Sequence, residues 1–254
     1  MIKKFEYSEF SLYFYKMTDS LQKKHLLIIL MIFCLWPVSH KGATAKGFYE
    51  KENYTQHLDS LRDTFSYKKT IPGKYELECL IALSFYPELK DVSIEFVDKN
   101  IKTTMAARPR ADAIFKQQPG RVYRIFINNN VRDSIGLSYD KVPFNARIGI
   151  IGHELAHIVD YENKSIFQIM LNGIAYISSS TFRKNFEKDI DQITIDRGLG
   201  YQLYAFSDFL FHKADVNPAY LDFKKKNYPL PKNYRTWLIK HPEYTGEVID
   251  QIAM

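Results

Sequence analysis

The stretch Gly152–Asp160 reads G-H-E-L-A-H-I-V-D and contains the pattern H-E-x-x-H at His153, Glu154 and His157. An α-helix turns by about 100° per residue, so side chains four positions apart lie on the same face. His153 and His157 can therefore hold one metal ion between them. Glu154 lies one position round the helix, where it can reach a water at the metal without binding the metal itself. This arrangement is typical of zinc hydrolases.

The residues around this pattern predict a helix over about 146–160. We expect Asn145 to cap its N-terminus, after the turn residue Pro143. Gly152 has no side chain, which predicts that another backbone approaches closely beside the site. The alternative is an ordinary amphipathic helix with two solvated histidines. Apolar residues recur at helical spacing, largely opposite the histidines, at Ile148, Ile151, Leu155, Ile158 and Val159.

Length and composition indicate one globular domain. The chain has 254 residues, of which 46% are apolar and 25% charged, enough for a sizeable core. With 18 Tyr and 18 Phe, intrinsic disorder is not expected. Cys79 is the only cysteine after residue 45, so the mature chain is not expected to form an internal disulfide.

The N-terminal segment has the pattern of a signal peptide. Lys23-Lys24 precedes the apolar run Leu26–Trp36, and Ala43-Thr44-Ala45 follows as an A-x-A cleavage site. The run has 11 residues, whereas a membrane-spanning helix needs about 20. We therefore predict a signal peptide over residues 1–45, with Met17 as a possible true start, and a mature domain over residues 46–254. Export to a periplasm or the extracellular space follows, or membrane anchoring if the run is not cleaved.

The charge of the mature chain argues against a nucleic-acid partner. Residues 1–45 hold six basic and three acidic side chains, so their removal lowers the net charge from +6 to +3. A net charge this small does not indicate binding to nucleic acid. The expected partner is a peptide or protein substrate, with no stable membrane span after cleavage.

Hydrophobic patterns predict an α+β fold with a small sheet. The alternating V-S-I-E-F-V predicts a strand over 92–97, and a second strand is expected over 121–128. Segment 103–109 is expected to form a loop. Further helices are expected over 75–85, over 166–178 as a buried helix, over 182–198 and over 199–213.

A catalytic zinc site needs a third protein ligand. The extended metzincin pattern would place a glycine and a third histidine after His157, and both are absent. On the later predicted helix, Glu187 and Asp191 are four residues apart and lie away from its apolar stripe. Glu187 could bind the metal, and Asp191 could accept the free ring N–H of a ligand histidine. Asp189 points elsewhere, and Glu162 is a weaker rival.

H-E-L-A-H followed by E-x-x-x-D resembles the gluzincin group of zinc metallopeptidases, in the form of a minimal domain. The resemblance covers about residues 92–205. It implies a zincin-like fold, in which a small mixed sheet with an edge strand over the cleft packs on the metal-binding helix and the C-terminal half is mostly helical. It also implies one Zn²⁺ per chain, held by His153, His157 and Glu187. Glu154 would be the general base, and Asp191 would hold a ligand histidine.

The resemblance also suggests where substrate would bind. The predicted strand 121–128 would correspond to the edge strand beside the cleft, with Tyr123, Ile125 and Ile127 along it. No motif places the groups that stabilise the transition state. Tyr201, Tyr204 and His212 are weak candidates, and a core position is the favoured interpretation for the tyrosines.

Three function classes follow from these observations. The favoured one is an exported zinc metallopeptidase. An exported binding protein with a zinc site kept for folding is the first alternative, and Glu154 argues against it because a structural zinc closes with four ligands and needs no base. A membrane-anchored processing peptidase is the second, and it depends on an uncleaved apolar run.

Overall fold

The structure is a computed structural model that describes residues 47–112, 120–129 and 137–244. These residues belong to a compact unit that spans residues 42–254. The predicted signal peptide, with its possible start at Met17 and its cleavage site at Ala45, lies outside the described residues. Within the described ranges, no helix is long and apolar enough to cross a bilayer.

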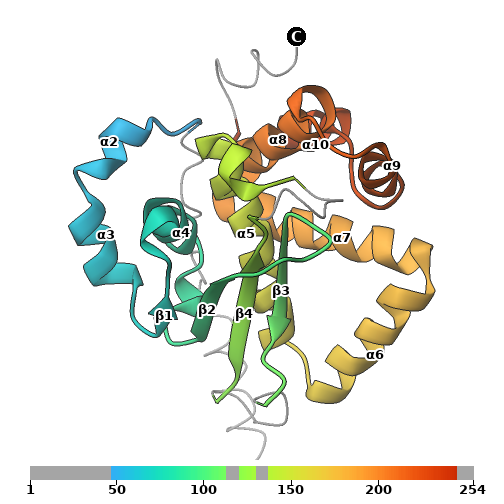
Figure 1. Ribbon diagram of the computed structural model, residues 1–254, viewed down its shortest axis with the longest axis horizontal. Helices are drawn as coiled ribbons and strands as arrows, with labels where there is room; N and C mark the ends of the chain where they lie inside the picture. The colour runs from blue at the N-terminus through green and yellow to red at the C-terminus, as the bar shows by residue number, and fades with distance from the viewer. Residues whose placement is uncertain (1–46, 113–119, 130–136, 245–254) are drawn as a thin grey trace, which may run out of the picture. The chain divides into compact units, whose positions relative to one another are not determined.

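One four-stranded mixed sheet, in the order β1-β2-β4-β3, forms the β part of the fold (Figure 1). The first three strands in this order are parallel, and β3 runs antiparallel to β4. Every second side chain of β2 and β4 is buried, as the period of two requires. The predicted α+β class with a small mixed sheet is confirmed. The strands are β1 (Lys69–Thr70), β2 (Ser93–Asp98), β3 (Met105–Pro109) and β4 (Val122–Ile127).

The edge strands are β1 and β3, and the prediction that strand 121–128 is the edge was wrong. β4 lies between β2 and β3, and its residues Tyr123, Ile125 and Ile127 are fully buried. The predicted loop over 103–109 was also wrong from residue 105 onward. The sequence M-A-A-R-P has weak strand propensity and a proline, so β3 depends on its pairing with β4.

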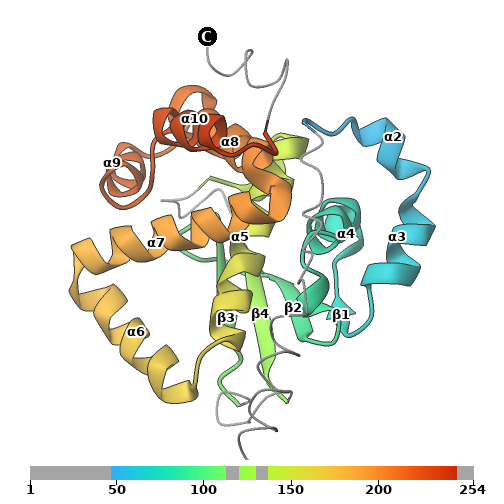
Figure 2. The ribbon, with the colours of Figure 1, turned by 180° about the vertical axis from the view of Figure 1, so that it is seen from behind.

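Helix α5 (Phe144–Glu162) packs across the sheet and against α4 (Glu76–Leu83). Figure 2 shows α5 in front of the strands. The largest hydrophobic core lies between these helices and the sheet. The short helices α2 (Lys51–Thr55) and α3 (Leu58–Phe65) lie on the β1 side of the sheet (Figure 1).

The start of α5 differs from the prediction in two details. Pro143 is the N-cap residue, and the side chain of Asn145, one residue inside the helix, exchanges hydrogen bonds with the backbone of Tyr49. The close backbone approach is at Gly149 and not at Gly152. A Cβ atom on Gly149 would lie 2.2 Å from a backbone oxygen of α8, whereas one on Gly152 would meet a leucine side chain at 2.5 Å.

The second half of the described chain is helical, as predicted. Two wide π turns, at 195–199 and 209–213, interrupt it. Gly198 allows the first turn because its φ is 97°, a value that side chains other than glycine rarely adopt. The helices are α6 (Ile166–Ser178), α7 (Ser180–Thr194), α8 (Gly200–Asp208), α9 (Pro218–Asn227) and α10 (Pro231–Lys240).

Helix α6 is not the buried helix that its composition predicts. Only Ile169 is buried, because α6 packs mainly on α7 and no other described element makes extensive contact with it. Figure 2 shows the two helices extending from the β3 side of the sheet. Five large apolar side chains of α6 are exposed to solvent, those of Phe167, Met170, Leu171, Ile174 and Ile177.

Candidate metal centre

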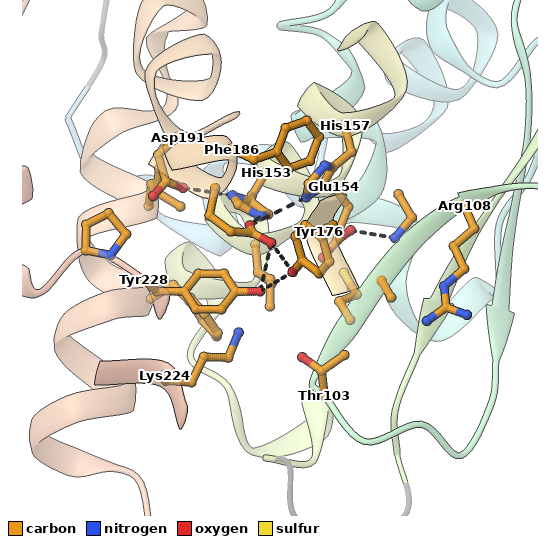
Figure 3. Close-up of a pocket in the computed structure, with 18 of the residues that line it drawn as sticks. Thr103, Arg108, His153, Glu154, His157, Tyr176, Phe186, Asp191, Lys224 and Tyr228 are labelled. Carbon is orange, nitrogen blue, oxygen red and sulfur yellow. Dashed lines mark hydrogen bonds and ion pairs between the residues drawn. The ribbon is translucent and has the colours of Figure 1, made fainter. Parts of the chain in front are cut away.

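Helices α5 and α7 bring three potential metal ligands together. His153 and His157 are one turn apart on α5 and are only 7% and 8% exposed. Oε2 of Glu187, on α7, lies 3.1 Å from Nε2 of His153 and 3.7 Å from Nε2 of His157. The ligand atoms of the three residues all lie within 4.8 Å of one another, and Figure 3 shows the two histidine rings beside each other. This group could hold a metal ion.

The two oxygens of Glu187 have different partners. Oε1 accepts hydrogen bonds from the hydroxyls of Tyr176 and Tyr228, the latter at 3.1 Å. Oε2 is buried and has no hydrogen-bond partner among the described residues. Burial alone would raise the pKa of Glu187, but the nearby His153 and His157 rings hold it well below its usual range. Oε2 is therefore a charged oxygen that faces the two histidines and is available to a cation.

A second carboxylate holds the ring of His153. Nδ1 of His153 lies 2.8 Å from Oδ1 of Asp191, and Oδ2 of Asp191 accepts a hydrogen bond of 2.7 Å from Tyr234 on α10. Burial would lower the pKa of His153, but its hydrogen bond with Asp191 and the nearby carboxylate of Glu187 raise it above its usual range. The site therefore favours a positive charge at Nε2, which a proton or a divalent metal can supply.

The donor set fits zinc. Two imidazole nitrogens and one carboxylate oxygen are ligands that catalytic zinc sites use, with a fourth position left for water. A metal on Oε2 of Glu187 would satisfy an oxygen that otherwise has no hydrogen-bond partner within the described ranges. Buried polar atoms without partners are uncommon in folded proteins, so the unpaired oxygen favours an ion at this position.

Glu154 connects this centre to the edge strand. Its side chain is buried, and Oε2 accepts a hydrogen bond of 2.6 Å from the backbone N–H of Ala107 on β3. Figure 3 shows the carboxylate between the histidines and the strand. One oxygen is therefore held by the sheet, close to the potential ligands but separate from them.

The edge of β3 that is not paired with β4 faces the metal centre. Arg110 N–H donates to Val122 O, and Asn128 N–H donates to Thr104 O, so the even-numbered residues of β3 form the hydrogen-bonded pairs with β4. In an antiparallel pair the residues between them direct their N–H and C=O groups away from the partner strand. Met105 and Ala107 therefore direct these groups away from β4, and Met105–Pro109 lines the cavity.

A cavity of about 780 Å³ adjoins the centre, between β3, α5 and the helices of the second half. Its volume lies in the range of about 300–1,000 Å³ typical of ligand sites. Apolar side chains form much of its wall, among them Ile169, Phe186, Phe206, Leu210 and Phe223.

The structure does not bring the predicted transition-state groups to this cavity. Tyr201 packs on Tyr244, and Tyr204 belongs to the same small core cluster beside α10. His212 is exposed and pairs with Asp208. None of the three lines the cavity, because α8 turns its two tyrosines toward α10.

The two rival acidic residues lie elsewhere as well. Asp189 is exposed, on the outer side of α7. Glu162 accepts a hydrogen bond from the hydroxyl of Tyr123, at the C-terminal end of α5. Glu187 is thus the carboxylate that α7 presents to the two histidines.

Several residues at the site are absent from the sequence prediction. Tyr176, Tyr228 and Tyr234 come from three different segments and hold the carboxylates of Glu187 and Asp191. Ala107 contributes only its backbone. No spacing in the sequence connects these residues, because each hydrogen bond joins segments that only the tertiary fold brings together.

Comparisons with protein-family models, with curated proteins and with solved structures find no match to this chain. The residues of the site and their geometry are therefore the basis for its function.

Proposed function

We propose that this chain is a zinc-dependent metallopeptidase of the gluzincin type, in which His153, His157 and Glu187 hold the metal. The observation that carries the proposal is the convergence of two histidine nitrogens on one unpaired carboxylate oxygen, with Glu154 beside them. A site with three protein ligands leaves room for a water and a substrate carbonyl, whereas a structural zinc site has four protein ligands.

Glu154 is the proposed general base. Zinc, when bound, lowers the pKa of water and polarises the carbonyl to be attacked. Glu154 would take a proton from the attacking water and deliver it to the leaving nitrogen. Its Oε2 accepts the hydrogen bond from Ala107 N–H, and this bond fixes the carboxylate while Oε1 accepts the proton.

Asp191 and Tyr234 are proposed to position His153. With Nδ1–H donated to Asp191, the neutral ring directs the lone pair of Nε2 toward the metal. Tyr234 holds the other oxygen of Asp191. Tyr176 and Tyr228 do the same for Glu187, since they engage Oε1 and leave Oε2 as the single ligand atom.

The proposed substrate is an extended peptide that pairs with the free edge of β3. The outward N–H and C=O groups of Met105 and the C=O of Ala107 would form backbone hydrogen bonds with it, the mode known as β-augmentation, while the N–H of Ala107 stays on Glu154. Pro109 has no N–H, so pairing would weaken at that end. The apolar wall of the cavity suits hydrophobic side chains of the substrate. Export of the chain is proposed from the sequence of residues 1–45.

Zinc content and cleavage of an unfolded protein, measured on the same sample, test the proposal. We expect Glu154→Gln to keep zinc and to lose about 10²- to 10⁴-fold in rate, the usual contribution of a general base. Glu162→Gln is the matched control on the same helix and should change neither quantity. A fully active Glu154→Gln protein would disprove the mechanism. A zinc-loaded wild type that cleaves no unfolded protein would instead favour the binding-protein alternative.

A further inference from the structure

Lys224, on α9, is a buried lysine that faces the cavity. It is 5% exposed and lines the cavity wall beside Tyr228, where Figure 3 shows its ammonium pointing toward the tyrosine ring. The next two residues, Lys225 and Lys226, are exposed. Of three consecutive lysines, one has therefore turned into the site.

The charge of Lys224 has no anionic partner in the described part of the chain. Its ammonium lies 3.6 Å from the ring centroid of Tyr228 and 5.6 Å from that of Tyr220, and no hydrogen bond or ion pair of the described residues engages it. Its neighbour Lys225, by contrast, lies 3.9 Å from Asp222. Aromatic faces stabilise a desolvated cation by less than the cost of burying it unpaired.

The charges on the cavity wall are separated by sign. The acidic residues that line it, Glu154, Glu187 and Asp191, all belong to the metal centre. Away from that centre, the charged lining residues are basic, namely Lys102, Arg108 and Lys224. A ligand that extends from the metal centre into the cavity would therefore meet positive charge.

Lys224 is also close to the reacting groups. The ammonium of Lys224 lies over the ring face of Tyr228, and the hydroxyl of Tyr228 donates a hydrogen bond of 3.1 Å to Glu187. One tyrosine ring thus separates Lys224 from a proposed metal ligand. An anion bound by Lys224 would belong to a residue at or next to the bond being cleaved.

We propose that Lys224 binds a carboxylate of the substrate, so that the chain selects peptides with a negative charge beside the scissile bond. This proposal rests on the proposed peptidase function. The carboxylate could be the side chain of an acidic residue or the C-terminus of the peptide, and Lys224 would recognise either by the same charge-assisted hydrogen bond.

A set of fluorescent apolar peptides tests the proposal. Half of the peptides form pairs that differ by Glu or Gln at one position, with each position tested in turn. The other half form pairs that differ only in ending with a carboxylate or an amide. Binding is measured on the metal-free full chain, where no metal can attract the carboxylate, and cleavage is measured on the zinc-loaded chain. We expect the wild type to favour the acidic member of at least one pair by about 10- to 100-fold, the usual effect of a hydrogen bond to a charged group.

Lys224→Met, which removes the charge and keeps the length of the side chain, should abolish this preference in binding and in kcat/KM. Lys225→Met, at the exposed neighbour, should leave it unchanged, and Lys224→Arg should retain much of it. A preference confined to the Glu/Gln pairs identifies a side-chain carboxylate, and one confined to the acid/amide pairs identifies the C-terminus.

Equal binding of all acidic and neutral peptides by the wild type would overturn the proposal, even if Lys224→Met does not fold. So would a folded Lys224→Met protein that keeps the preference. If the peptides bind with charge preference but none is cleaved, the proposal for Lys224 stands and the peptidase function fails.

Discussion

The neighbours of Glu187 fix the orientation of this potential metal ligand. Two tyrosine hydroxyls occupy one of its oxygens, and the other faces two histidine nitrogens. A carboxylate held in this way presents one oxygen to a metal, and its orientation does not depend on the metal alone. Removing the tyrosines would free Glu187 to rotate, while removing Glu187 would leave the site without a negative ligand.

Replacing Glu187 by Ala should therefore lower zinc affinity strongly. We expect a loss greater than the roughly 10- to 100-fold that follows when an outer partner of a metal ligand is removed. Titration against a chromophoric chelator measures this loss. Asp189→Ala, at an exposed acidic position of the same helix, is the control and should bind zinc as the wild type does. The opposite pattern would mean that α7 presents a different face to the histidines.

The position of helix α5, which holds His153 and His157, depends on its close packing with α8. Gly149 lies where α8 crosses α5, and a Cβ atom there would overlap the backbone oxygen of Gln202. Gly173, in the middle of α6, has no atom within 4 Å of the position of a Cβ. The two glycines are both helical, but only the first is required by a neighbouring backbone.

The two Gly→Ala substitutions should consequently have effects of opposite sign on the free energy of unfolding. Gly149→Ala must separate two packed helices, and overpacking of this kind costs about 1–3 kcal/mol. Gly173→Ala should stabilise the protein by up to about 1 kcal/mol, because alanine favours a helix over glycine. Urea denaturation of both variants measures the difference. Equal effects would show that α5 and α8 can move apart without loss.

For the whole molecule, a bound metal would join α5 to α7. In the metal-free protein, the lowered pKa of Glu187 and the raised pKa of His153 have opposite consequences for stability. The contribution of Glu187 is present above its unfolded pKa of about 4.5 and is lost as the pH falls. The contribution of His153 is complete below about pH 6.5, its unfolded pKa, and is lost as the pH rises through the folded value.

Zinc should thus raise the thermal midpoint more at pH 8 than at pH 6. Zinc displaces a proton from His153, and this costs less as the pH rises. At one fixed zinc concentration, set to 100 times the dissociation constant at pH 8, the expected stabilisation is about 2.7 kcal/mol at pH 8 and smaller at pH 6, where zinc binds more weakly. A chelator should reverse it, and the measurement is thermal unfolding with and without zinc at each pH. His157→Ala should lose most of the response. A response that is larger at pH 6 than at pH 8 would contradict the proposed role of His153.

Much of the local structure followed from the sequence because it depends on neighbouring residues. The H-E-x-x-H helix, the two strands at 92–97 and 121–128 and the helix of Glu187 and Asp191 show the periods that α-helices and strands require. The four-residue spacings place two histidines on one face of α5 and two carboxylates on one face of α7. The α+β class follows from the order of these elements. Export remains a prediction, because residues 1–45 lie outside the described part of the chain.

Tertiary structure alone decided which strand forms the edge, which tyrosines hold the carboxylates and which lysine enters the cavity. β3 becomes a strand through its pairing with β4, and α6 stays exposed because, among the described elements, it packs mainly on α7. Lys224 and Lys225 are adjacent lysines that the sequence does not distinguish, and the packing of α9 buries the side chain of Lys224. These features depend on contacts between segments far apart in the chain. Local patterns do not encode them, because the free energy that decides them arises only when the segments meet.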